Sequence, residues 1–199
     1  MPHIDYFFAT VSPFTYIAGT KMEEIAAKHG CTITYKPLDV IALFGRTGGI
    51  KPAERHESRK AYRLQELRRQ AAKRDMPINL QPAFWPTNPA PSSYALIAAS
   101  KVEGGNMGAL VHAITRRCWA EEMNIAEDDV IRAALEEAGF DPGLADTGML
   151  AGAEEYAANL EEAVNAGAFG APFYIVDGTE HFWGQDRIED LDLFLSGKL

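Results

Sequence analysis

The sequence predicts an α/β fold in which a small sheet is interrupted by a large all-helical insertion. Two short apolar segments near the N-terminus are rich in aromatic residues, which is typical of buried strands. Two more strand patterns appear only from residue 170 onward. Between them, over residues 50–165, the hydrophobic spacing is helical and no segment predicts a strand.

The composition of the chain limits the classes of protein to which it can belong. The chain has 199 residues, of which 47% are hydrophobic and 24% charged, so it can build a core beneath a soluble surface. Its formal charge of −9 disfavours nucleic acid or an anionic membrane as a partner. Cys31 and Cys118 are too far apart to suggest a disulfide framework, and the histidines are too scattered for a metal site. With no signal peptide or membrane span in evidence, we expect a cytoplasmic protein.

The N-terminal segment predicts a β-α-β unit. Residues 3–10 form a mostly apolar strand. Ser12 is a good helix N-cap, and Pro13 suits the first helical position. We expect one helix from there to Gly30, which would end it, and a second strand over residues 33–37.

Helical periodicity dominates the middle of the chain. Apolar residues recur at helical spacing around residues 64–71, 110–118 and 153–164. In the last of these stretches we expect one apolar stripe of Ala153, Ala157, Leu160 and Val164. Residues 81–91 break this pattern with four prolines, which predicts a long loop. We therefore expect an inserted helical domain over residues 46–165.

The C-terminal segment returns to β structure. Asp177 and Gly178 suit a tight turn between strands over residues 173–176 and 179–182, and a last helix is expected over residues 187–195. The element order β-α-β, helical block, β-β-α is that of a thioredoxin-like fold cut once. Residues 1–45 and 166–199 would together form the thioredoxin-like domain.

The start of the first helix is the first candidate site. Thioredoxin-type redox proteins place a C-x-x-C pair here, because a helix N-terminus stabilises a thiolate. Ser12 and Thr15 occupy both cysteine positions, so this site cannot exchange disulfides by itself. Its backbone N–H groups and Ser12 Oγ could hold a thiolate that a cofactor supplies. The alternative is that Ser12 serves only as an N-cap.

Two further segments would meet that helix in this fold. Pro172 precedes the third strand, and a cis Ala171–Pro172 bond would present the Ala171 backbone to a ligand; a trans proline starting an edge strand is the alternative. Gln185 and Asp186 precede the last helix. Asp186 could pair with an α-amino group, or it could cap that helix and leave Arg187 in solvent.

Over essentially its full length, the chain resembles the 2-hydroxychromene-2-carboxylate isomerase family. That family has a DsbA-like thioredoxin fold and is related to kappa-class glutathione transferases. The segments that carry the resemblance are Asp5-Tyr6-Phe7-Phe8, Ser12-Pro13-Phe14-Thr15-Tyr16, Tyr35-Lys36-Pro37-Leu38, Trp85-Pro86-Thr87-Asn88, Gly170-Ala171-Pro172-Phe173 and Phe182-Trp183-Gly184-Gln185-Asp186-Arg187.

The resemblance implies glutathione as the cofactor. It places Ser12 beside the glutathione sulfur, Ala171 before cis Pro172 at the cysteinyl backbone, and Gln185 with Asp186 at the γ-glutamyl end. Two features depart from the family pattern. Ala171 is smaller than the usual Val or Leu, and residues 46–49 correspond to the loop after the second strand, where the family often has a glutathione-binding asparagine.

The resemblance also implies a reaction. The family interconverts 2-hydroxychromene-2-carboxylate and trans-o-hydroxybenzylidenepyruvate, a step in aromatic catabolism. Our hypothesis is thiolate addition to the conjugated enone, rotation about the resulting single bond, and elimination of the thiolate.

The substrate would be a small aromatic carboxylate, so its pocket needs aromatic surface and a cation. The candidates are Phe14, Trp85 and Asn88, with Lys36 or an arginine for the carboxylate. Trp119 is a further candidate, although its position late in a helix favours the core. Residues 51–74 hold nine of the 19 basic residues, a pattern that favours a solvated helix face.

Other functions remain open at this stage. A kappa-type glutathione transferase would use the same thiolate site, and a non-catalytic module would bind glutathione or a peptide without turnover. A disulfide oxidoreductase would have to use Cys31 or Cys118, neither of which starts the first helix. By analogy with its relatives we expect a homodimer.

Overall fold

The computed structural model describes residues 1–147 and 149–199, and it contains a four-stranded mixed sheet of order β2-β1-β3-β4. β1 (His3–Phe8) pairs in parallel with β2 (Thr32–Pro37). On its other edge β1 pairs antiparallel with β3 (Phe173–Val176), which continues antiparallel to β4 (Glu180–Trp183). These strands confirm the predicted thioredoxin-like fold.

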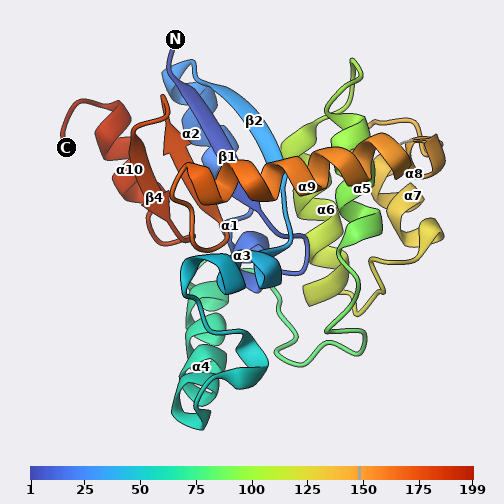
Figure 1. Cartoon of the computed structure of the whole chain (residues 1–199), viewed down its shortest axis with the longest axis horizontal. Helices are drawn as coiled ribbons and strands as arrows, with labels where there is room; N and C mark the ends of the chain where they lie inside the picture. Colours follow the sequence, from blue (N-terminus) through green and yellow to red (C-terminus); the bar gives the residue numbers. More distant parts are fainter. Residues whose placement is uncertain (148) are drawn as a thin grey trace.

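Helices fill the connections from β1 to β2 and from β2 to β3, and a last helix follows β4 (Figure 1). Throughout the described residues between β2 and β3 the structure contains helices, turns and loops but no strand, as expected. The helices are α1 (Pro13–Ala18), α2 (Lys21–His29), α3 (Val40–Thr47), α4 (Glu57–Lys73), α5 (Ala90–Ala99), α6 (Met107–Trp119), α7 (Asp128–Glu137), α8 (Leu144–Thr147), α9 (Met149–Asn165) and α10 (Ile188–Leu195).

Alternation along the strands divides the core between the two faces of the sheet. Tyr6 and Phe8 point to one face and join a large apolar cluster that reaches Leu110 of α6 and Ile131 of α7. Phe7 points to the other face and packs in a smaller cluster of α3, α9 and strand residues. Figure 1 shows α9 running across the sheet toward α5. We call these the α1 face and the α9 face.

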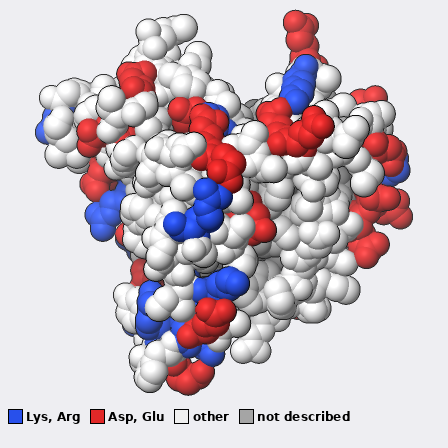
Figure 2. All heavy atoms as spheres, viewed as in Figure 1, with Lys and Arg blue, Asp and Glu red and all other residues white. Residues whose placement is uncertain are grey.

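The large cluster contains residues of both the sheet and the inserted helices. The proposed division into residues 1–45 with 166–199 and residues 46–165 stays a prediction. None of the helices in the described residues has the length and apolarity that crossing a bilayer requires. In Figure 2, Lys and Arg gather with some acidic residues in the lower part of the view where α4 lies, and the edge near α7 and α8 is mostly acidic.

Three local expectations were wrong. The single helix after Ser12 is two helices, because the chain turns at Gly19, where φ is +60°. Arg46 and Thr47 belong to α3 rather than to a loop. The buried stripe of α9 includes Gly152 and Asn159, whereas Ala157 is exposed. Close packing explains the shifted stripe, since a Cβ on Gly152 would lie 2.7 Å from Tyr94 Cβ of α5.

Candidate functional site

Ser12 begins α1 as predicted. Its backbone is extended, with φ −82° and ψ 122°, and its Oγ accepts a hydrogen bond from Thr15 N at 3.3 Å. The same hydroxyl donates toward the carbonyl oxygen of Ala171 at 3.4 Å. Ser12 is therefore both an N-cap and a contact to the segment that enters β3.

The Ala171–Pro172 peptide bond is cis, so the trans alternative is wrong. Gly184 N donates to the Pro172 carbonyl at 2.9 Å, which ties this segment to the one before α10. Gly184 has φ +106°, and a Cβ there would lie 2.6 Å from Asp186 Oδ1. The structure thus brings together all three segments that the sequence analysis singled out. We call the place where they meet the Ser12 junction.

Several hydrogen-bonding groups at this junction are free. Neither Phe14 N nor Ala171 N donates to any acceptor within the described residues. Thr15 Oγ1, in the second of the two hydroxyl positions, is buried and also has no partner there. Because buried polar groups are nearly always paired, the unpartnered Thr15 Oγ1 points to a polar ligand here, and the two N–H groups are donors available to such a ligand.

Gln185 and Asp186 lie at the edge of the junction. Gln185 is buried, and its carbonyl accepts a 2.8 Å hydrogen bond from Arg74 Nη2 at the end of α4. The Asp186 side chain is 48% exposed and lies 3.7 Å from Arg187. Arg187 occupies the N-cap position of α10 without a side-chain cap, so Asp186 does not cap that helix. Its carboxylate remains available to a ligand.

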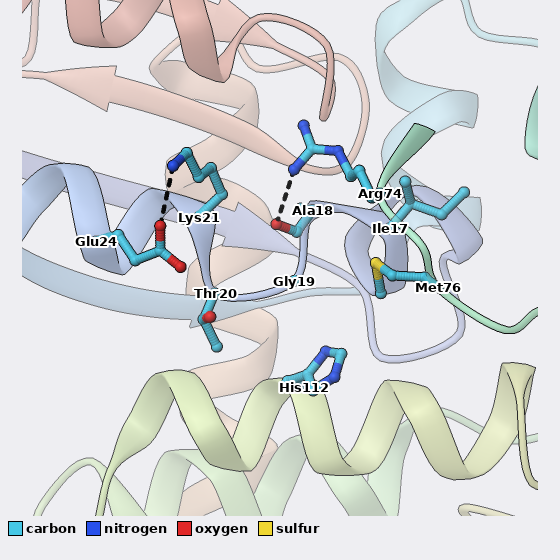
Figure 3. A pocket seen from close by; sticks show the side chains of 9 residues that line it. All are labelled: Ile17, Ala18, Gly19, Thr20, Lys21, Glu24, Arg74, Met76 and His112. Atoms are coloured by element: carbon cyan, nitrogen blue, oxygen red, sulfur yellow. Dashed lines mark hydrogen bonds and ion pairs between the residues drawn. The ribbon is translucent and has the colours of Figure 1, made fainter. Parts of the chain in front are cut away.

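Arg74 also borders a shallow hollow beside the end of α1 (Figure 3). Its Nη1 donates to the Ala18 carbonyl at 3.5 Å, and His112 of α6 lies across the hollow. The His112 ring stacks on Tyr16 of α1, whose hydroxyl donates to the Pro77 carbonyl at 2.5 Å. No predicted site residue lines this hollow. Its residues instead hold α1 in position.

The two thiols are not activated. Cys118 is buried in α6, and burial raises its pKa to about 12. Burial also raises the pKa of Cys31 above its usual value. A nucleophilic cysteine needs a lowered pKa, so neither thiol suits disulfide exchange.

The fold agrees with the comparison to protein families. The family described as "DSBA-like thioredoxin domain" matches residues 3–196. The chain belongs to this family.

Three individual proteins are similar to this chain over most of its length. A 2-hydroxychromene-2-carboxylate isomerase of Sphingobium xenophagum is 30% identical over 96% of this chain and 97% of the relative. A glutathione S-transferase kappa 1 of Caenorhabditis elegans is 28% identical, covering 94% and 88% of the two chains. A solved 2-hydroxychromene-2-carboxylate isomerase superposes with a TM-score of 0.79 at 22% identity over 98% of this chain and 95% of that one, which supports the fold.

Among the residues predicted to bind substrate, Trp85 lies beside the junction. Its Nε1 donates to the carbonyl oxygen of Val11, the residue before Ser12, at 3.2 Å. Phe14 is half-buried in α1 and packs against the large cluster. Asn88 is exposed, and its Oδ1 accepts from Ala90 N at 3.1 Å, which helps to start α5.

Lys36 lies on β2 and is committed to other partners. Its ammonium is 2.8 Å from Asp5 Oδ1 and also contacts Glu162 of α9. It lies 5.3 Å from the centroid of the Phe7 ring, on the α9 face of the sheet. The structure therefore does not bring Lys36 to the Ser12 junction.

Arg63 of α4, which the sequence reasoning did not single out, lies against two of the candidate aromatic residues. Its guanidinium carbon lies 5.4 Å from the Trp85 ring centroid and 5.9 Å from that of Trp119. Burial, and then the neighbouring Arg55, lowers its pKa to about 10. The sequence did indicate that Arg63 faces the core. Arg63 precedes the buried Leu67 and Ala71 at a spacing of four and so lies on the apolar stripe of α4.

Proposed function

We propose that this protein is a glutathione-dependent isomerase that interconverts 2-hydroxychromene-2-carboxylate and trans-o-hydroxybenzylidenepyruvate. The observation that carries the proposal is the Ser12 hydroxyl at the start of α1, within 3.4 Å of the Ala171 carbonyl that precedes cis Pro172. Hydroxyl residues at both redox positions leave room for a thiol that is not the protein's own. The names of the curated relatives support both the isomerase activity and the use of glutathione.

The residues at the junction suit glutathione. The free Ala171 N–H offers the pairing that an extended peptide requires. The exposed carboxylate of Asp186 suits the α-amino group of the γ-glutamyl end. Ser12 Oγ and the free Phe14 N–H would be the donors to the thiolate of a bound glutathione.

When bound, glutathione supplies a thiolate that adds to the conjugated double bond, allows rotation, and leaves again. Ser12 stabilises that thiolate by turning its weak 3.4 Å hydrogen bond from the Ala171 carbonyl toward the sulfur. Thiols near pKa ~8.5 are mostly protonated at neutral pH, and each unit of depression corresponds to about 1.4 kcal/mol of preferential thiolate stabilisation. One hydroxyl and one peptide N–H supply interactions of that size.

A kappa-type glutathione transferase is the second candidate, and the nematode relative favours it. The two activities differ in whether glutathione is consumed. An isomerase regenerates free thiol, whereas a transferase loses one thiol for each product molecule. A non-catalytic module would bind glutathione and turn nothing over.

We also propose that the protein acts in the cytoplasm and forms a homodimer. Light scattering of the purified protein would test whether it is a dimer.

Calorimetric titration with glutathione tests the proposal directly. We expect saturable binding that Asp186→Ala weakens about tenfold, the loss of one charge-assisted hydrogen bond. Glu189→Ala is the matched control, since this exposed acid on the same segment should leave affinity unchanged. Absence of binding at millimolar glutathione, or equal weakening by both variants, would contradict the proposal. Turnover with constant free thiol then identifies the isomerase.

A further inference from the structure

We propose that Arg63, together with the indoles of Trp85 and Trp119, forms an anion-binding pocket that takes the carboxylate of a small aromatic acid. This inference deepens the proposed function by assigning the carboxylate contact, and it relies on that function only for the identity of the natural substrate.

The charge balance around Arg63 is the first argument. No carboxylate forms an ion pair with its guanidinium, and no acceptor hydrogen-bonds to it, in the part of the chain that the structure describes. Arg55 is a second cation nearby. Its Nε donates a hydrogen bond to the Ile50 carbonyl at 2.9 Å, and its guanidinium lies over the Phe44 ring. Both side chains are half-buried, and neither has an acidic partner among the described residues. A bound anion would compensate them.

An unused hydrogen-bond donor provides the second argument. Trp119 is fully buried, with 0% of its surface exposed, and its Nε1 has no acceptor among the described residues. Leaving such a group unpaired costs free energy, and native structures rarely do so. Arg63 contributes up to five further donors in a planar fork. A cluster with donors and no acceptors is complementary to a carboxylate, which carries only acceptors.

The aromatic rings and their position specify the rest of the ligand. The Trp85 and Trp119 centroids are 5.6 Å apart, with the ring planes inclined at 50°, and the guanidinium lies over both. The half-buried Trp85 offers indole surface that favours a flat aromatic ring beside the carboxylate, while the fully buried Trp119 contributes its Nε1 donor. Trp85 is hydrogen-bonded to Val11, which directly precedes Ser12. A ligand held by Arg63 is therefore next to the position proposed for the thiolate.

A purely structural role for Arg63, in which the indoles alone stabilise the cation, predicts different behaviour. It gives no preference for carboxylates over neutral ligands, and it makes Arg63→Gln less stable. The anion pocket predicts selective binding, and it predicts that removing an uncompensated cation leaves stability unchanged or raised.

The test measures binding of 3-phenylpropionate, which has no double bond for a thiolate to attack, and of its neutral amide. Titrations use the whole chain with saturating glutathione and follow tryptophan fluorescence. We expect the parent to prefer the acid over the amide. Arg63→Gln should weaken binding of the acid about ten- to a hundredfold and leave binding of the amide unchanged. Arg63→Lys keeps the charge without the planar fork, so its affinity should lie between the two.

Arg68→Gln is the matched control, because this exposed arginine lies one turn further along α4. Thermal unfolding verifies that each variant is folded. Equal affinity of parent and Arg63→Gln for the acid, or no preference of the parent for acid over amide, would overturn the inference. If acid selectivity depends on Arg63 but 2-hydroxychromene-2-carboxylate is not isomerised, the proposed function fails and the anion pocket stands.

Discussion

The two faces of the sheet each hold a cation against an aromatic ring, and they treat it in opposite ways. On the α9 face, Lys36 lies over Phe7 and is paired with Asp5 and Glu162. On the α1 face, Arg63 lies over Trp85 and Trp119 without any acidic partner in the described residues. Acidic residues of the protein compensate the charge of Lys36, whereas no described residue compensates the charge of Arg63.

The same contrast extends to acidic side chains. Asp5 and Glu162 on the α9 face are paired with Lys36, but Glu23 of α2 on the α1 face has no cationic partner among the described residues. Its Oε1 accepts from the Tyr35 hydroxyl at 3.2 Å, while its buried Oε2 has no partner within the described residues. The charges of Lys36, Asp5 and Glu162 on the α9 face are thus paired, whereas Arg63 and Glu23 on the α1 face have no partner of opposite charge in the described part of the chain. The following predictions test that difference.

The largest expected effect is the pH dependence of stability set by Glu23. Burial raises its pKa to about 7 from an ordinary value of 4.5. The stabilising contribution of Glu23 to the free energy of unfolding is therefore fully present below pH 4.5, and it is lost as pH rises through about 7. Glu23→Gln should remove this dependence and stabilise the protein on the order of 3 kcal/mol above pH 8, relative to its effect at pH 4. Urea unfolding from pH 4 to 9 measures it, with Glu24→Gln as the control; parallel stability curves for parent and Glu23→Gln would refute it.

Loss of Lys36 should affect stability and spare activity. Lys36→Met leaves Asp5 half-buried without its cation and should lower the free energy of unfolding by about 2 kcal/mol. Adding Asp5→Asn should restore part of that loss, because it removes the uncompensated charge. Urea unfolding and isomerase kinetics measure the two effects. If Lys36→Met raises KM for the carboxylate substrate more than Arg63→Gln does, the roles of the two cations must be exchanged.

Replacement of Ser12 should lower turnover through the thiolate. Ser12→Ala removes one donor and should reduce kcat about tenfold, together with about 1 kcal/mol of stability from the lost cap. Ser12→Asp restores the cap but has no hydroxyl to donate, so stability should return while kcat stays low. Steady-state kinetics with thermal unfolding separates the two roles. Recovery of kcat in Ser12→Asp would reduce Ser12 to a cap.

The smallest effect is expected on the outer rim of the α9 face. Arg46 forms an exposed ion pair with Glu161, with Nη1 and Oε1 2.6 Å apart. Exposed pairs contribute little in solution, so Arg46→Ala should leave the urea midpoint unchanged. A clear decrease would mean that the α9 face depends on surface charge as well as on its buried pair.

Local signals in the sequence predicted most of the fold. Ser12 before Pro13 marked the start of α1, Gly30 the end of α2, and the Asp177-Gly178 turn the hairpin of β3 and β4. The break at Gly19 escaped prediction because the apolar spacing continues across it. Only the backbone conformation of that glycine reveals the turn, and one glycine within a helical pattern does not specify it.

The candidate site was predicted unevenly for a physical reason. Ser12, Ala171 and Pro172 come together because fold topology alone brings the start of α1 beside the entry to β3. The roles of Lys36 and Arg63 depend on distant partners instead. Glu162 approaches Lys36 from 126 residues away, and no such residue approaches Arg63 in the described chain. Charge compensation of this kind is a tertiary property that local patterns do not contain.

Arg74 makes the helical segment and the sheet mechanically dependent on each other. One guanidinium at the end of α4 donates to both the Ala18 carbonyl at the end of α1 and the Gln185 carbonyl before α10. Any change in the length of α4 would pull on both attachments together and so misalign Ser12 with Asp186. A chimaera that exchanges the helical segment for another would have to keep an arginine at this point, which limits how freely the fold can be recombined.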